Sequence, residues 1–380
     1  MSRAAEKALL PAGLRDILPP DAAFEAAVVE RVMACFAAQG YERVKPPLIE
    51  FEEGLLSGPG AALASDTFRL MDPVSQRMMG LRADMTLQVA RIAATRLRNQ
   101  PRPLRLSYAG QVLRVTGSQL RPERQFGQAG VELIGAVSAA ADAEVALLAA
   151  EALSVVGVAG VSVDLNLPTL AATVATALGF EGELRTALVK ALDRKDAAAV
   201  GALAGPHGAL FAGLLAAGGP ARRALQRLAR LDLPAEAARE RDRLAEVVEL
   251  VLAAAPELTV TVDPVEHRGF EYHSGISFTL FARRVRGELG RGGRYLTAAG
   301  ESSTGFTLYM DTLLRALPAP ATERRLYLPA GTAGSEGRAL RDEGWITVAG
   351  FDAAADPRAE AKRQRCTHVL VGKKAVALEE

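Results

Sequence analysis

The segment GQVLRVTGSQLRPERQFGQAGVELIG (residues 110–135) contains two runs in which apolar and polar residues alternate, joined by a loop. Gly117 and Pro122 interrupt the alternation between the runs, so we predict a β-hairpin. Successive side chains of a strand point to opposite faces, so the polar positions of each run share a face. These positions are Arg114 and Thr116 in the first run, and Gln128, Gly130 and Glu132 in the second. If both rows lie on one side, the hairpin presents a cation, an amide and a carboxylate on one wall of a small-molecule site.

The composition excludes several classes of protein. The chain has 380 residues, 49% of them hydrophobic, which is enough for a large core and more than one domain. Its 45 lysines and arginines balance 44 aspartates and glutamates, so no overall field attracts nucleic acid or an anionic membrane. No apolar run reaches the roughly 20 residues that span a bilayer, and the first residues lack the apolar core of a signal peptide. We therefore expect a cytoplasmic protein with no membrane contact and no nucleic-acid partner.

The sequence also lacks the residue patterns of common cofactor sites. Cys35 and Cys366 are far apart and form no CxxC motif, and the four histidines are scattered along the chain. This argues against a disulfide framework and against zinc. Because the glycine motifs of P-loop and dinucleotide-binding folds are missing too, we predict neither a metal nor a cofactor.

Periodicity and turn residues predict the secondary structure of the first half of the chain. We expect a helix over 21–39 with Asp21 as its N-cap, and an extended chain over 41–51 that two prolines confine to an edge, a bulge or an interface. A hairpin over 66–82 turns at Asp72-Pro73, and an amphipathic helix follows Asp84. After the hairpin at 110–135 come an alanine-rich helix near 140–156 and a strand over 161–167.

The composition changes at about residue 168. From there to about 255, alanine, leucine and arginine dominate, which indicates a separate helical insertion in the sheet domain. Strands return at 258–262, 276–282 and 304–308, and we expect Gly292-Gly293 to shape a turn between the last two. Two prolines mark a linker near 318–320, and 325–380 alternates short strands and helices.

The order of these signals resembles the core of class II aminoacyl-tRNA synthetases, and histidyl-tRNA synthetase in particular. The matching segments are LPAGLRDILP (10–19), VKPPLIE (44–50), FRLMDP (68–73), LRADMT (81–86), the hairpin at 110–135, HRGFEYHSG (267–275), GRGGRY (290–295) and TGFTLYMDTLL (304–314). The resemblance implies an α+β fold with an antiparallel sheet flanked by helices over 1–317, including the helical insertion. It also implies that 323–380 is a small α/β segment, a shortened remnant of an anticodon-binding domain, acting as a structural cap or subunit contact.

Several residues that bind the nucleotide in the synthetase family are replaced in this sequence. Thr116 stands where the family has a glutamate, Pro122 where it has a loop arginine, and Thr312 where its third motif has an arginine. A triphosphate needs charged, preferably bidentate donors, and threonine supplies neither charge nor a forked group. The resemblance with these losses implies that the chain does not adenylate an amino acid.

The amino-acid half is better preserved. The positions that the resemblance assigns to histidine binding are Asp84, Thr86, Arg114, Gln128, Glu132, Arg268, Tyr272 and His273. Asp84 stands where a longer glutamate is usual, and His273 replaces a second tyrosine. Carboxylates suit an α-ammonium group and a ring N–H, and Arg268 suits an α-carboxylate.

A histidine pocket beside a dismantled ATP pocket resembles the regulatory subunits of ATP phosphoribosyltransferase, although Ala83 replaces a proline usual in that family. This resemblance implies a subunit without catalysis of its own that dimerises through the class II interface and joins short catalytic subunits in a hetero-octamer. It would activate them and relay feedback inhibition by L-histidine in the first step of histidine biosynthesis. The alternative is a divergent histidine-activating enzyme that uses Arg114 and Arg268.

Simpler interpretations of the same residues remain open. Asp84 precedes a helix, so N-capping alone explains it as well as ligand contact does. Arg121, Glu123 and Arg124 are expected to form a solvated turn. Gln128 and Glu132 could pair with Arg114 across the hairpin instead of facing a ligand.

Overall fold

The computed structural model describes residues 9–56, 58–117, 121–267, 272–320 and 322–378. The chain divides into two compact units, Met1–Pro318 and Ala319–Glu380. In the described part of the chain, no helix is both long and apolar enough to cross a membrane.

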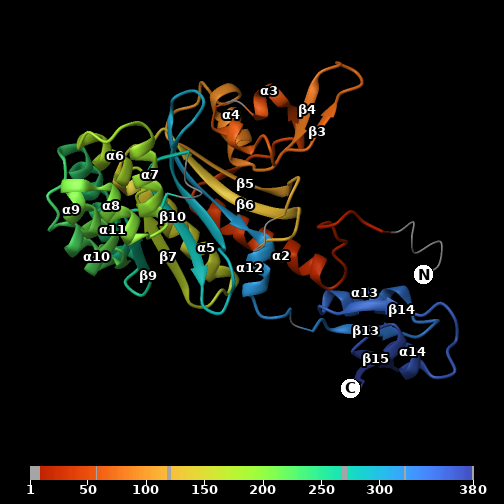
Figure 1. Cartoon of the computed structure of the whole chain (residues 1–380). Coiled ribbons are helices and arrows are strands. Elements are labelled where there is room, and N and C mark those ends of the chain that lie inside the picture. The colour runs from red at the N-terminus through yellow and green to blue at the C-terminus, as the bar shows by residue number, and fades with distance from the viewer. Residues whose placement is uncertain (1–8, 57, 118–120, 268–271, 321, 379–380) are drawn as a thin grey trace. The chain divides into compact units, whose positions relative to one another are not determined.

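A nine-stranded sheet in the order β1-β5-β6-β12-β11-β10-β7-β9-β8 forms the centre of the first unit (Figure 1). Its strands are β1 (Glu42–Arg43), β5 (Leu104–Leu113), β6 (Gln125–Ile134), β7 (Val161–Asn166), β8 (Gly219–Pro220), β9 (Thr259–Asp263), β10 (His273–Ala282), β11 (Gly290–Leu296) and β12 (Ser302–Tyr309). All neighbours are antiparallel except β1 with β5 and β7 with β9. The predicted hairpin is β5 and β6. The chain over 41–51 forms β1 at the edge of this sheet and β2 (Ile49–Phe51) in a separate three-stranded sheet.

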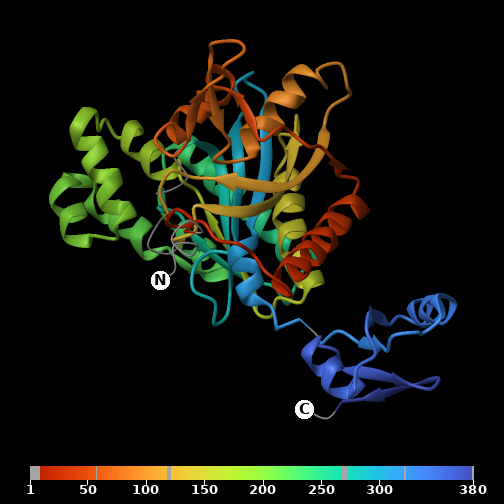
Figure 2. The same ribbon diagram turned by 90° about the vertical axis from the view of Figure 1, so that its right-hand side faces the viewer.

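Helices cover one face of this sheet. Figure 2 shows α2 (Asp21–Ala38) and α5 (Ala139–Val156) side by side, and both pack on the odd-numbered residues of β6, including Val131. Asp21 is the first helical residue of α2 rather than its N-cap, which is Pro20 and forms no side-chain capping bond. The Asp21 carboxylate therefore acts on the helix only through its place in the positive first turn.

The opposite face of the sheet carries smaller elements. Here α4 (Thr86–Thr95) packs Val89 and Ala93 on β5, beside a three-stranded sheet in the order β2-β4-β3. The remaining elements are β2 (Ile49–Phe51), α3 (Glu52–Leu55), the 3-10 helix η1 (Gly58–Leu63), β3 (Arg69–Met71) and β4 (Met78–Leu81). The predicted turn at Asp72-Pro73 joins β3 and β4, and the Asp72 carboxylate accepts bonds from the Val74 and Ser75 N–H groups.

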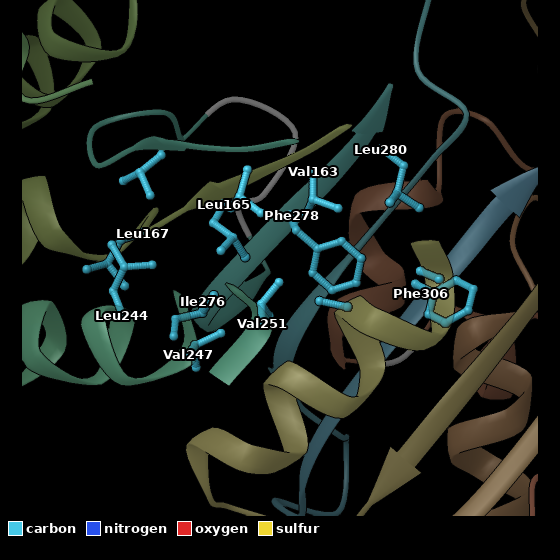
Figure 3. Packing of buried hydrophobic residues seen from close by; sticks show 14 of the residues in the cluster. Val163, Leu165, Leu167, Leu244, Val247, Val251, Ile276, Phe278, Leu280 and Phe306 are labelled. Carbon is cyan, nitrogen blue, oxygen red and sulfur yellow. The ribbon is translucent and has the colours of Figure 1, made fainter. Parts of the chain in front are cut away.

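The insertion consists of helices gathered beside β7 and β9 (Figure 1). They are α6 (Leu170–Ala177), α7 (Gly182–Asp193), α8 (Ala197–Leu203), the 3-10 helix η2 (Gly205–His207), α9 (Gly208–Ala216), α10 (Ala221–Leu228) and α11 (Ala235–Ala254). The insertion does not form a hydrophobic core separate from that of the sheet. Leu244, Val247 and Val251 of α11 lie in one hydrophobic cluster with the inner residues of β7 and β10 (Figure 3). A helix that covers the sheet buries more apolar area than an isolated bundle of alanine-rich helices would.

The second unit has its own four-stranded sheet, in the order β14-β13-β15-β16. Its elements are β13 (Arg325–Leu328), α13 (Gly334–Asp342), β14 (Ile346–Ala349), α14 (Pro357–Arg363), β15 (His368–Val371) and β16 (Lys374–Ala377). Leu326 and Leu328 face one small core with Trp345, whereas Tyr327 faces another with Ala361. Alternating residues of β13 are thus buried on both faces, as expected of a central parallel strand.

Candidate functional site

A cavity of about 280 Å³ lies on the face of the sheet opposite α2 and α5, between β6, β11, β12 and the start of α4. We call it the Glu132 cavity. Six of the eight predicted site residues line it: Asp84, Thr86, Arg114, Glu132, Tyr272 and His273. Arg268 lies outside the described residues. Glu132 points toward the cavity because the odd-numbered residues of β6 face α2 and α5 on the other side of the sheet.

Glu132 forms the floor of the cavity and is almost completely buried. The Tyr295 hydroxyl donates a bond of 2.8 Å to Glu132 Oε2, and the Tyr108 hydroxyl lies 3.5 Å from Oε1. Within the described residues, no lysine or arginine forms an ion pair with this carboxylate. Burial raises the pKa of Glu132 to about 8, an effect that its hydroxyl donors oppose. Burial thus favours the neutral form of the Glu132 carboxyl group.

The Asp84 side chain bonds to the first residue of α4 and lines the cavity, but the N-cap of α4 is Met85. Asp84 Oδ1 accepts a bond of 2.9 Å from the Thr86 N–H, and Asp84 Oδ2 accepts one of 2.9 Å from Gln128 Nε2. Gln128 Oε1 also accepts the Met85 N–H at 3.1 Å. Gln128 is buried and is not among the residues that line the cavity, and its amide group holds Asp84 in place.

The simpler pairing across the hairpin is wrong for the described residues. Gln128 is bonded to Asp84 and Glu132 to Tyr295, whereas the Arg114 Nε–H donates to the Ala83 carbonyl at 3.4 Å. Arg114 lies just beyond the end of β5, and its guanidinium lies 5.3 Å from the centre of the Phe126 ring on β6.

Glycines make room for the cavity. Gly292 and Gly293 lie within β11, so the predicted turn is wrong at these positions. A Cβ on Gly293 would lie 2.6 Å from a ring carbon of His273, and one on Gly305 of β12 would lie 2.1 Å from Glu132 Oε2. The strands can therefore approach Glu132 and His273 only where no side chain intervenes.

Four titratable residues that line the cavity were not predicted from the sequence. They are Asp66, Arg291, Tyr295 and Tyr309. In GRGGRY, Arg291, Gly293 and Tyr295 alternate with period two, so recognising this stretch as a strand would have placed them on one face. Asp66 comes from the connection before β3, and no local pattern indicated it.

A second hollow, which we call the Thr312 cleft, adjoins the cavity and shares Asp66, Arg114 and Arg291 with it. Thr116 and Thr312 line this cleft. Two of the arginines that line it face carboxylates: Arg291 binds Glu288 with two contacts of 2.7 and 2.9 Å, and Arg121 Nε lies 3.2 Å from Asp311 Oδ2.

The predicted solvated turn at residues 121–124 is wrong. The Arg121 side chain is only 12% exposed, and its guanidinium lies 3.7 Å from the centre of the Tyr309 ring. Arg124 donates to the Ala12 carbonyl at 3.1 Å. Aromatic and carbonyl partners from distant segments thus order this loop, which local polarity could not indicate. Among the residues that the structure describes, no group of three or more histidine, cysteine, aspartate or glutamate side chains could hold a metal ion.

Comparison with known proteins identifies the family. A sequence model described as histidyl-tRNA synthetase matches residues 13–313. The ATP phosphoribosyltransferase regulatory subunit of Paramagnetospirillum magneticum is 64% identical over 97% of this chain and 98% of its own length. This chain belongs to the family of ATP phosphoribosyltransferase regulatory subunits. The family predicted from the sequence is therefore confirmed.

Solved structures confirm the fold predicted for this regulatory-subunit family. A Bacillus halodurans ATP phosphoribosyltransferase regulatory subunit/histidyl-tRNA synthetase superposes with a TM-score of 0.81, at 24% identity over 94% of this chain and 96% of its own. A chain of the Thermotoga maritima ATP phosphoribosyl transferase (HisG:HisZ) complex superposes with a TM-score of 0.61, at 19% identity over 75% and 97%. The class II synthetase-like α+β fold is thus shared.

Proposed function

We propose that the protein is a noncatalytic regulatory subunit that binds L-histidine in the Glu132 cavity. It dimerises, joins short catalytic subunits of ATP phosphoribosyltransferase in a hetero-octamer and activates them. It also relays feedback inhibition by histidine in the first step of histidine biosynthesis. The observation that carries this proposal is a buried carboxyl group on the floor of a small polar cavity, next to a cleft in which Arg121 and Arg291 already face carboxylates.

The cavity offers a complementary group for each polar part of histidine. Asp84 suits the α-ammonium group, Glu132 suits a ring N–H of the imidazole, and Arg114 suits the α-carboxylate. Thr86, Tyr272 and His273 complete the walls, and the proposal includes Arg268 as a further contact on sequence grounds. A ligand that brings a positive charge would also favour the ionised form of Glu132.

The Thr312 cleft supports the absence of adenylation. Thr116 and Thr312 carry no charge. Arg121 already forms an ion pair with Asp311, and Arg291 forms one with Glu288. A triphosphate entering here would have to displace these carboxylates or lie beside them. Without fixed cations to stabilise the charge of the transition state, amino-acid activation would be slower by orders of magnitude.

The named relatives support the partner and the cellular setting. The Paramagnetospirillum protein is named a regulatory subunit, and the Thermotoga structure is named a complex. We place the protein in the cytoplasm with its catalytic partner, where free thiols such as the buried Cys35 and Cys366 are stable. We propose that the second unit is a remnant of an anticodon-binding domain that serves as a cap or subunit contact.

One observation favours the alternative of a histidine-activating enzyme. Arg114 lines both the cavity and the cleft, and no described carboxylate forms an ion pair with it. It could therefore contact a phosphate and a carboxylate at their junction. The enzyme reading requires this single arginine, with Arg268, to replace the cations missing at Thr116 and Thr312.

Two assays distinguish the candidates. The purified chain should show no histidine-dependent ATP–pyrophosphate exchange, but it should raise phosphoribosyl transfer when mixed with the short catalytic subunit. Calorimetry should show histidine binding that Glu132→Ala abolishes and the exposed-site control Glu30→Ala leaves unchanged. Exchange above background that Arg114→Ala removes would establish the enzyme instead, and failure to stimulate the catalytic subunit would refute the regulatory role.

A further inference from the structure

The chain between β9 and β10 connects the helical insertion to the Glu132 cavity. Asp263 ends β9, and Tyr272 and His273 at the start of β10 line the cavity. Residues 264–267 are the described part of the connection that precedes Tyr272 and His273. Most of the polar contacts of residues 264–267 are with residues that are distant in the sequence.

The C-terminal end of α7 holds this connection at two points. The His267 backbone N–H donates a bond of 2.8 Å to Asp193 Oδ1, where Asp193 is the last residue of α7. Lys195 Nζ lies 2.6 Å from Asp263 Oδ1, the oxygen that also accepts the Val265 N–H at 3.1 Å. The insertion thus contacts both ends of the described connection.

The sheet holds the same connection from the other side. Asn166, the last residue of β7, is fully buried and donates to Glu266 Oε2 at 3.0 Å and to Asp164 Oδ2 at 3.1 Å. Burial raises the pKa of both carboxyl groups. The sheet therefore holds Glu266, and the insertion holds His267. Both elements together determine where the described part of the connection ends.

The turn that carries Asp193 and Lys195 is stabilised independently of these contacts. The Lys195 N–H donates to the Leu192 carbonyl at 3.0 Å, and the Asp196 side chain caps α8 through the Ala199 N–H at 2.9 Å. The Lys195 side chain is 44% exposed. Shortening either side chain should therefore remove the contact with the connection and preserve the turn.

We infer that Asp193 and Lys195 are positioning residues that couple the helical insertion to the effector cavity, by fixing the connection that leads to Tyr272 and His273. This inference rests on histidine binding in the Glu132 cavity. Because coupling between two sites is reciprocal, bound histidine must in turn strengthen the hold of α7 on residues 264–267. A partner that displaces the end of α7 would weaken histidine binding by the same factor.

Calorimetric titration of histidine into the full chain tests this coupling. We expect Asp193→Ala to lower the affinity about tenfold, the effect of losing roughly one hydrogen bond to a charged group. Lys195→Ala should lower it less, because that ion pair is partly exposed. Asp193→Asn keeps an oxygen for the His267 N–H and should restore affinity to within about twofold of wild type. Glu183→Ala, in the exposed first turn of the same helix, is the matched control and should have no effect.

Hydrogen exchange gives a readout that loss of overall stability would not reproduce. Saturating histidine should slow amide exchange in peptides covering 188–196 and 264–267 of the wild type, and this protection should be lost in Asp193→Ala. If the wild type binds histidine and both alanine variants bind it equally well, the coupling is refuted while the proposed function stands. If the wild type binds no histidine, the proposed function itself fails. Lys195→Ala keeps the test decisive if Asp193→Ala does not fold.

Discussion

Tyr295 donates a hydrogen bond of 2.8 Å to Glu132 although their strands, β11 and β6, are not neighbours in the sheet. Strand β12 runs between them, and its residue opposite Glu132 is Gly305. The bond passes over this glycine, where a Cβ would come within 2.1 Å of the accepting oxygen. The absence of one side chain on the middle strand thus allows two outer strands to share a buried carboxyl group.

Gly305→Ala should therefore disrupt the floor of the cavity. The new methyl group would overlap Glu132 Oε2 and the Val131 carbonyl, so we expect a loss of about 2–4 kcal/mol in the free energy of unfolding and no histidine binding. The matched control is Gly201→Ala in α8, where a Cβ meets nothing within 4 Å. It should raise stability by about 0.5–1 kcal/mol through helix propensity. Urea unfolding and calorimetry measure both, and an unchanged Gly305→Ala would contradict this account.

Glu132 should make stability depend on pH. Its pKa is near 4.5 when unfolded and about 8 when folded, so the folded protein holds an extra proton between these values. The contribution of Glu132 is then fully present below about pH 4.5 and is lost as pH rises through 8. Relative to Glu132→Gln, wild-type unfolding free energy should fall by up to about 1.4 kcal/mol per pH unit in this window. A difference between the two proteins that stays constant from pH 5 to 8 would show that Glu132 is ionised.

Asp142 joins three elements through buried ion pairs. It lies in the first turn of α5, with Arg294 of β11 at 2.7 Å and Arg243 of α11 at 2.8 Å. Asp142→Ala leaves the buried Arg294 without this carboxylate, so we expect a loss of about 3–5 kcal/mol in urea unfolding. Glu30→Ala, which breaks the exposed pair with Arg43, should cost less than about 1 kcal/mol. Equal effects from the two variants would be inconsistent with the burial difference.

Arg114 should contribute to ligand affinity far more than to stability. It lines the cavity, and its side chain donates a long bond of 3.4 Å to the Ala83 carbonyl. Arg114→Ala should weaken histidine binding by about 1.5–3 kcal/mol, the range for a bond to a charged group, with little change in urea unfolding. Arg98→Ala, an exposed arginine just after α4, is the control. A large loss of stability without loss of affinity would mean that Arg114 is structural.

The hairpin was predictable because its information is local. Alternation along 125–134 placed Gln128, Gly130 and Glu132 on one face, and strand β6 keeps that assignment, whereas Arg114 and Thr116 lie beyond the end of β5. Strand β5 begins earlier than the alternation suggested, at Leu104, since its first residues are buried or half-buried on both faces and carry no period of two. The helix after Asp84 was equally readable, because Val89 and Ala93 lie on one stripe.

Other features depended on partners far along the chain. Gly292-Gly293 has the composition of a turn, but β10 and β12 pair with it on both sides and make it a strand. Arg121 belongs to a polar loop by sequence, yet Tyr309 and Asp311, almost two hundred residues away, bury it. Propensity describes a residue with its neighbours, and such contacts override it.

The sequence by itself determined the family, the hairpin with its polar face, and the residue types available to a histidine pocket, because alternation and motif order are properties of neighbouring residues. Tertiary structure alone decided that Gln128 bonds to Asp84 and that carboxylates pair with Arg121 and Arg291 in the Thr312 cleft. It also decided that the end of α7 contacts the connection between β9 and β10. These relations join atoms from distant segments, and only the folded sheet brings those atoms within bonding distance.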